Sequence, residues 1–198
     1  MFHYKAEQLD KKQQYKLVSG SVIPRPIAWV TSLSKDGSVV NAAPFSFFSA
    51  ASNELPLLTV AILRKDGVIK DTARNILDRK EAVVHIVDQS VVEEMNRTSA
   101  PLPPDQSEID QTQLTLVDSL SVKVPSIAEA KIRFEGVLHQ YIPVKNEKDE
   151  VVTDFFFDEA VFDQEKEYIL TDKLNPVARL AGNQYATLDE EFTIVRPN

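Results

Sequence analysis

The sequence predicts a mainly β protein in which an antiparallel barrel carries short peripheral helices. Strand-like segments recur along the chain, and the helical segments between them are short. A doubly wound parallel sheet needs a helix of about three or more turns at each crossover, so that architecture does not fit. The 198 residues, 43% of them hydrophobic, are enough for one well-packed domain. We therefore expect residues 1–198 to form a single domain.

The first predicted element is a hairpin that follows a polar leader over residues 1–16. Residues 27–33 are typical of a strand, Asp36-Gly37 of a tight turn, and residues 39–43 of the returning strand. Trp29 in the first of these strands is expected to be a core residue. Beyond the hairpin, residues 57–63 lack polar alternation, which predicts a strand buried on both faces that ends at a second Asp-Gly pair, 66–67.

The period of the apolar residues then changes. Residues 69–77 have helical spacing, with Asp71 or Thr72 near the N-cap, and residues 82–87 return to a strand. Ser90 and Glu93 form a capping-box pattern ahead of another short helix.

The second half of the chain begins with residues 98–121, which are rich in proline and polar residues and predict a long loop or lid. Strands are expected at 131–142, 151–157, 168–170 and 192–195. Asn175-Pro176 followed by Gly182 predicts a short helix between them.

Composition excludes several functional classes. Without cysteine there is no disulfide, thiolate metal site or cysteine redox centre, so electron chemistry requires a bound cofactor. A formal charge of −8 argues against binding nucleic acid or anionic membranes. The apolar runs are too short to cross a bilayer, and no export signal is visible, so we expect a cytoplasmic protein. The histidines, His3, His85 and His139, are too dispersed to predict a metal site. We expect His3 to lie in a mobile leader, His85 to be a satisfied interior or rim residue, and His139 to be exposed.

The chemically informative segments are residues 25–32, RPIAWVTS, and residues 41–49, NAAPFSFFS. Pro44 lacks an amide hydrogen and ends the strand ladder, while Ser46 and Ser49 offer hydroxyls. Small residues, free donors and flanking phenylalanines suit a flat aromatic ligand that carries a phosphate. On its own, the segment is also compatible with a serine-rich strand exit and core phenylalanines; of these, we expect Phe47 to be core.

Together with residues 70–76, KDTARNI, and 175–185, NPVARLAGNQY, these segments resemble the flavin-reductase-like family of FMN-binding split barrels. The resemblance spans residues 17–197. It implies a split β-barrel of antiparallel Greek-key strands, a noncovalently bound FMN and a homodimer. The family's Arg-Leu-Gly-Gly is Arg179-Leu-Ala-Gly182 here, and the extra methyl of Ala181 is expected to narrow the approach at that point.

By this resemblance, one group of residues should border the flavin ring, the ribityl chain or the phosphate: Thr31, Ser32, Asn41, Ala43, Phe45, Ser46, Phe48 and Ser49. A second group surrounds a helix start that suits a phosphate, or lies near the flavin or the subunit junction: Arg25, Lys70, Asp71, Thr72, Asn75, Arg179 and Tyr185.

The resemblance implies that FMN accepts a hydride from NADH or NADPH and passes electrons to a small-molecule or protein acceptor. The cofactor carries that chemistry, so no catalytic residue is assigned. Three alternatives remain open: a non-catalytic FMN carrier or redox-sensing module, a pyridoxal-phosphate oxidase-like barrel, and a β-barrel interaction protein without a cofactor.

Overall fold

The computed structural model describes residues 1–65, 67–144, 152–180 and 183–197. It consists mainly of strands with a few short helices, which confirms the predicted class. Its contacts separate two compact units. Unit 1 comprises Met1–Pro24 and Pro143–Phe192, and unit 2 comprises Arg25–Ile142 and Thr193–Asn198. Each unit is described in turn, and the single domain expected from the sequence stays a prediction.

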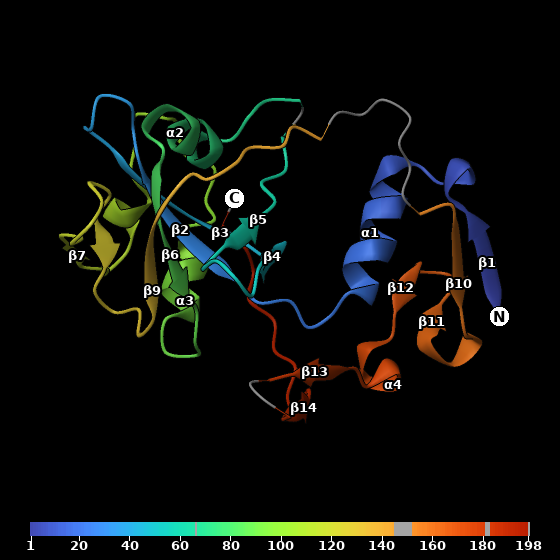
Figure 1. Cartoon of the computed structure of the whole chain (residues 1–198). Coiled ribbons are helices and arrows are strands. Elements are labelled where there is room, and N and C mark those ends of the chain that lie inside the picture. Colours follow the sequence, from blue (N-terminus) through green and yellow to red (C-terminus); the bar gives the residue numbers. More distant parts are fainter. Residues whose placement is uncertain (66, 145–151, 181–182, 198) are drawn as a thin grey trace. The chain divides into compact units, whose positions relative to one another are not determined.

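The centre of unit 2 is a four-stranded antiparallel sheet in the order β3-β2-β6-β9 (Figure 1). Every residue of the inner strand β2 is buried, as its unbroken run of apolar and small residues requires. Pro44 does not end the ladder as predicted: it lies within β3 at the edge of the sheet, where a missing amide hydrogen is tolerated, and pairing continues to Phe45. The strands are β2 (Ala28–Leu33), β3 (Val40–Phe45), β6 (Glu81–Ile86) and β9 (Arg133–Val137).

The predicted hairpin between β2 and β3 is confirmed. Gly37 has a φ of 81°, a conformation that favours glycine, and Ser34 N–H donates to Val39 O at 2.9 Å. The Asp36 carboxylate accepts from the backbone and side chain of Ser38 and from the Ser34 hydroxyl, and these bonds lower its pKa to about 2.

Smaller elements surround this sheet in unit 2. They are the paired strands β4 (Phe48–Ala50) and β5 (Leu58–Val60), the paired strands β7 (Leu116–Val117) and β8 (Ser126–Ile127), the helices α2 (Asp71–Arg79) and α3 (Val92–Arg97), and the 3-10 turn η2 (Glu108–Gln111).

Three details of unit 2 differ from the sequence predictions. The strand expected at 57–63 is shortened to β5 and is not buried on both faces, because it pairs with β4 alone in a two-stranded sheet. The N-cap of α2 is Lys70. Ser90 does not cap α3; its amide donates instead to the carboxylate of Asp88 at 2.7 Å. The second Asp-Gly turn includes residue 66, which lies outside the described residues.

Trp29 is the largest fully buried side chain of unit 2. It packs in a cluster with Val91, Met95, Ile109 and Ile127, which confirms its predicted core position. Its indole Nε1 donates to Thr98 Oγ1 at 2.9 Å. The segment 98–121 therefore supplies core residues, and part of it packs against β3 through η2.

His85 in β6 is held in one neutral tautomer by its backbone partners. The amide of Ile127 must donate, so it fixes Nε2 as an acceptor at 2.9 Å, and Nδ1 then donates to Trp29 O at 2.9 Å. The side chain is fully buried, so His85 is a satisfied interior residue as predicted. Burial lowers the pKa of His85, and the charge of Arg133 acts in the same direction.

This arrangement predicts a pH dependence of stability. Because the pKa of His85 is lower in the folded protein, the unfolded chain binds more protons once the pH falls below about 6.5. The free energy of unfolding should therefore decrease between pH 7 and pH 5, by at most about 1.4 kcal/mol per pH unit from this group. Urea unfolding across this range should show the decrease in the wild type and a smaller one in His85→Gln. His139→Gln, which removes an exposed histidine, should keep the wild-type slope; equal slopes in all three proteins would contradict the assignment.

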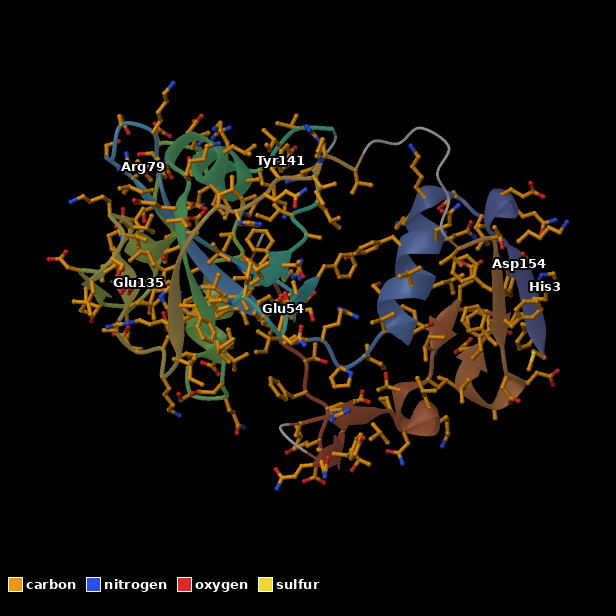
Figure 2. The ribbon with its side chains drawn as sticks, viewed as in Figure 1. His3, Glu54, Arg79, Glu135, Tyr141 and Asp154 are labelled. Carbon is orange, nitrogen blue, oxygen red and sulfur yellow. The ribbon has the colours of Figure 1, made fainter. Side chains whose placement is uncertain are left out.

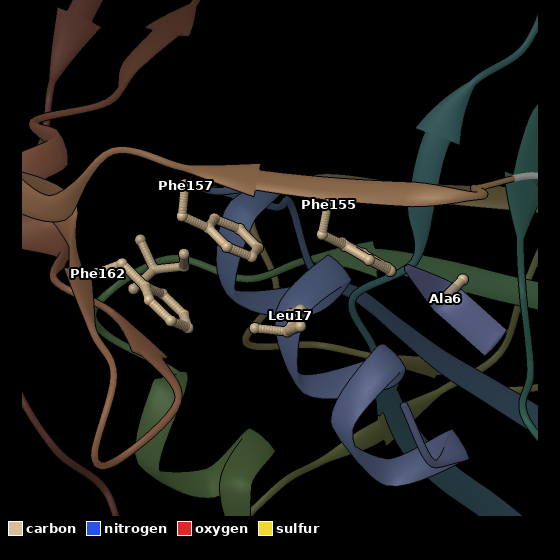
Figure 3. Packing of buried hydrophobic residues seen from close by; sticks show 6 residues of the cluster. Ala6, Leu17, Phe155, Phe157 and Phe162 are labelled. Carbon is tan, nitrogen blue, oxygen red and sulfur yellow. The ribbon is translucent and has the colours of Figure 1, made fainter. Parts of the chain in front are cut away.

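Unit 1 has its own hydrophobic core, in which Leu17 of α1 meets Phe155, Phe157 and Phe162 (Figure 3). The Phe157 and Phe162 rings stack with centroids 4.6 Å apart. The elements of unit 1 are β1 (Phe2–Lys5), η1 (Ala6–Gln8), α1 (Lys11–Ser21), β10 (Asp154–Phe157), η3 (Glu159–Val161), β11 (Phe162–Asp163), β12 (Tyr168–Ile169), α4 (Thr171–Leu174), β13 (Val177–Arg179) and β14 (Tyr185–Thr187).

Two expectations for unit 1 are wrong. The leader forms β1, which pairs with β10, and the beginning of α1; His3 Nε2 donates to Asp154 Oδ1 at 2.7 Å (Figure 2). The Asn175-Pro176 pair ends a helix rather than beginning one, because Asn175 adopts the left-handed C-cap conformation of α4. The chain then continues as strand β13. The expected cap Gly182 and residue 151 lie outside the described residues.

Candidate functional site

The start of α2 and the end of β3 come together in unit 2. The Lys70 ammonium lies 5.6 Å from the centre of the Phe45 ring, which connects the helix start to the last residue of β3. The first intrahelical bond of α2 joins Arg74 N–H to Lys70 O at 3.0 Å, so the amides between these residues precede the helical ladder. Such amides, with the positive end of the helix dipole, favour an anion.

Positive charge gathers around Lys70 although the whole chain is acidic. Partial burial lowers the pKa of Lys70, and the charges of Arg196 and Lys65 lower it further. Among the residues that the structure describes, none of these three cations is in an ion pair. An anion bound here would relieve this mutual repulsion.

Beneath this surface lies a buried hydrogen-bond network centred on Asn41. Its Oδ1 accepts from Thr72 Oγ1 at 2.6 Å and from Ser32 Oγ at 3.3 Å. Asn75 Nδ2 in turn donates to Ser32 Oγ at 3.2 Å. All four side chains are at least 94% buried, so the network joins the first turns of α2 to β2 and β3.

Glu108 completes the network, and the sequence reasoning missed it. Its carboxylate accepts from Asn41 Nδ2 at 2.8 and 2.9 Å and from the Ala42 amide at 3.0 Å. Burial raises the pKa of Glu108, and the charge of Asp71 adds to that effect, while the bonds from Ala42 and Asn41 oppose it. The signal available in the sequence was the pair Ser107-Glu108, a cap and an acid within a proline-rich segment that seemed peripheral.

The remaining predicted binding residues of unit 2 range from fully buried to exposed. Thr31 is fully buried, and its hydroxyl donates to Pro125 O at 2.8 Å. Arg25 Nε donates to Ser46 Oγ at 3.4 Å, and its guanidinium lies 5.8 Å from the Phe47 ring centre. Ala43, Ser46 and Phe48 are half-buried, Ser49 is exposed, and Asp71 pairs with Arg74 on its own helix.

The prediction that Phe47 is the core phenylalanine is wrong, and Arg179 and Tyr185 lie outside unit 2. Phe45, not Phe47, is the phenylalanine buried in a core cluster, because it ends β3 opposite Ala28 of the fully buried β2. Arg179 and Tyr185 face each other across the β13–β14 hairpin, with the guanidinium 5.8 Å from the ring centre. Both belong to unit 1, so their part in a site on unit 2 stays a prediction.

The rest of the described structure offers no alternative site with the predicted binding residues. A cavity in unit 1 contains three carboxylates and none of the predicted binding residues; it is lined by Thr171, Asp172, Asn175, Pro176, Leu188, Asp189 and Glu191. Within the described ranges, no group of three His, Asp or Glu side chains could hold a metal ion, and no helix could span a membrane.

The residues around α2 and β3 fit the chemistry of FMN. A phosphate dianion suits the clustered cations and helical amides at Lys70. A flat ring suits the half-buried Phe47 and Phe48, and ribityl hydroxyls suit Ser46 and Ser49.

Comparison with known proteins decides the family. Residues 19–153 match the flavin reductase like domain. The chain belongs to the flavin reductase-like family. Nitrilotriacetate monooxygenase component B from Bacillus cereus is 40% identical, with 98% of each chain covered and a TM-score of 0.73. The 2-nitrobenzoate 2-nitroreductase NbaA of Pseudomonas fluorescens is 32% identical, with 99% of this chain and 96% of that chain covered and a TM-score of 0.66.

The fold follows from the same comparisons. A Shewanella frigidimarina protein with a split barrel domain is 20% identical, covers 100% of both chains and has a TM-score of 0.59. The chain therefore has the split-barrel fold of its family, and membership supports a flavin-related oxidoreductase.

Proposed function

We propose that unit 2 binds FMN noncovalently, with the phosphate at the start of α2 and the flavin ring beside the segment that follows β3. The observation that carries this proposal is the group of cations around Lys70, which form no ion pair with the described residues, next to helical amides and the Phe45 ring, in a chain of the flavin reductase-like family. FMN rather than riboflavin is favoured because this end of the site has affinity for a dianion.

The predicted residues of unit 2 would then have three kinds of role. The more accessible ones, Arg25, Ser46, Phe48, Ser49 and Lys70, contact the cofactor. The buried Ser32, Asn41, Thr72 and Asn75 already satisfy one another, so they support the site instead of donating to the flavin. Ala43, Phe45, Asp71 and Thr31 shape the surroundings.

Bound FMN would accept a hydride from NADH or NADPH and pass electrons to a small-molecule or protein acceptor. The chain's part is to hold the phosphate, orient the ring and shield it from water. We further propose that the protein is cytoplasmic and that it is a homodimer, the latter as the family resemblance implies. Sedimentation of the purified protein tests the dimer, and a monomer that still holds FMN would contradict it.

Hydride transfer is tested by steady-state consumption of NADH and of NADPH at 340 nm, with the purified protein, FMN and oxygen or a nitroaromatic acceptor. We expect turnover that saturates with the nicotinamide and depends on the protein. If the protein binds FMN but consumes neither nucleotide above the rate of free FMN, it is a flavin carrier or redox-sensing module.

A further inference from the structure

Glu108 stands apart from the residues that the family resemblance points to, because it lies within the proline-rich segment and not on the sheet. Only 6% of it is exposed, yet its carboxylate accepts three hydrogen bonds, all from Asn41 and Ala42. Burying a carboxylate is costly unless it is hydrogen-bonded. The three hydrogen bonds compensate for this cost, and they connect the segment 98–121 to strand β3.

The chemistry of the carboxylate fixes the orientation of Asn41. An ionised carboxylate can only accept, so the Asn41 amide nitrogen must face Glu108. The amide oxygen is then left to face α2, where it accepts from the hydroxyl of Thr72 at 2.6 Å. The Glu108 carboxylate thereby determines which group donates and which accepts in the hydrogen bonds from Asn41 to the first turn of α2.

That first turn is where we place the phosphate, so this step rests on the proposed FMN site. Thr72 is the second residue of α2 and follows Lys70 by two positions. If its hydroxyl loses its acceptor, the buried hydrogen bond between the helix start and β3 is lost, and the amides and Lys70 are less well aligned for an anion. The ring end of the site, formed by residues after β3, is not tied to α2 in this way.

We propose that Glu108 is a positioning residue of the flavin site, which orients Asn41 and through it holds the start of α2 in place for the phosphate. Glu108 itself does not contact the cofactor.

The network offers a test in which donors and acceptors are exchanged. In Glu108→Gln, the new amide group can accept from Ala42 but presents a donor to Asn41. With the new amide oxygen at the Oε2 position, where it accepts from Ala42, the new amide nitrogen takes the Oε1 position, which lies 2.8 Å from Asn41 Nδ2 in the wild type. Two donors then face each other, and Asn41 relieves this contact by turning its oxygen toward the new amide nitrogen and away from Thr72, whose hydroxyl loses its acceptor. In Asn41→Asp/Glu108→Gln, Asp at 41 accepts from Gln at 108, Thr72 and Ser32 together, so the network is complete and its total charge is unchanged.

Equilibrium titrations of the wild type and both variants with FMN and with riboflavin, followed by flavin fluorescence, make the comparison. We expect Glu108→Gln to weaken FMN about tenfold, as one buried hydrogen bond is worth about 1.4 kcal/mol. Riboflavin affinity should change less than threefold, and the double variant should return to within about threefold of the wild type for FMN. Urea unfolding and near-UV circular dichroism verify that each variant is folded.

The inference is overturned if Glu108→Gln loses stability but binds FMN like the wild type, if it weakens both flavins equally, or if the exchanged pair does not restore FMN binding. A wild-type protein that binds neither flavin would instead refute the proposed function, so the two failures are distinguishable.

Discussion

Replacement of Trp29 by alanine is expected to lower the free energy of unfolding by about 3–5 kcal/mol. The indole is fully buried in a cluster that Met95 of α3, Ile109 of η2, Ile127 of β8 and Val91 complete. Its removal leaves a cavity that these side chains cannot fill without moving. Urea denaturation of the purified variant measures the loss, and a change below about 1 kcal/mol would contradict this packing.

Two further variants separate packing from hydrogen bonding. Trp29→Phe keeps most of the ring volume but loses the Nε1 donor; Thr98 Oγ1 still donates to Met95 O at 2.7 Å, so a smaller loss is expected. Leu120→Ala removes a side chain of a residue that is 97% exposed, and it should leave stability unchanged within about 0.5 kcal/mol.

Replacement of Lys70 by glutamine is expected to weaken FMN binding by roughly tenfold to a hundredfold, since a hydrogen bond to a charged group contributes about 1.5–3 kcal/mol. Lys70 caps α2 and lies within the electrostatic reach of Arg196 and Lys65, so its removal takes away both a donor and part of the local positive potential. Riboflavin, which lacks the phosphate, should bind the variant and the wild type with similar affinity. Paired fluorescence titrations with FMN and riboflavin provide the measurement.

Lys35→Gln is the matched control for Lys70→Gln. Lys35 is also an exposed lysine of unit 2, but it lies in the turn between β2 and β3. This variant has the same change in net charge as Lys70→Gln, but the change lies away from the start of α2. Its FMN affinity should therefore equal that of the wild type. If both variants weaken FMN to the same extent, the effect of Lys70 is general electrostatics and not a phosphate contact.

The sheet of unit 2 could be predicted well from the sequence, because its signals are local. The Asp36-Gly37 turn and the apolar run of β2 fix the hairpin without knowledge of the rest of the chain. Errors arose where one local pattern had two structural meanings. Asn175-Pro176 can precede a helix or follow one, and the choice depends on a left-handed residue that no spacing reveals.

The candidate site could be located but not resolved into roles. Sequence motifs named Asn41 and Thr72 as polar residues near a cofactor, yet whether a side chain faces a ligand or another side chain depends on burial. The pair Ser107-Glu108 marks a cap and an acid, but it could not show what Glu108 bonds to, because its partners are 66 and 67 positions away in the chain. Such long-range pairing between a loop and an edge strand has no local signature.

The central claim is that unit 2 holds FMN, and a visible absorption titration of the purified protein with FMN tests it most directly. We expect perturbed flavin bands that saturate at about one FMN per chain, either in the protein as purified or after addition of the cofactor. A protein that is colourless as purified and produces no saturable spectral change with excess FMN would contradict the account, and the polar groups around Asn41 would then be part of the barrel's architecture alone.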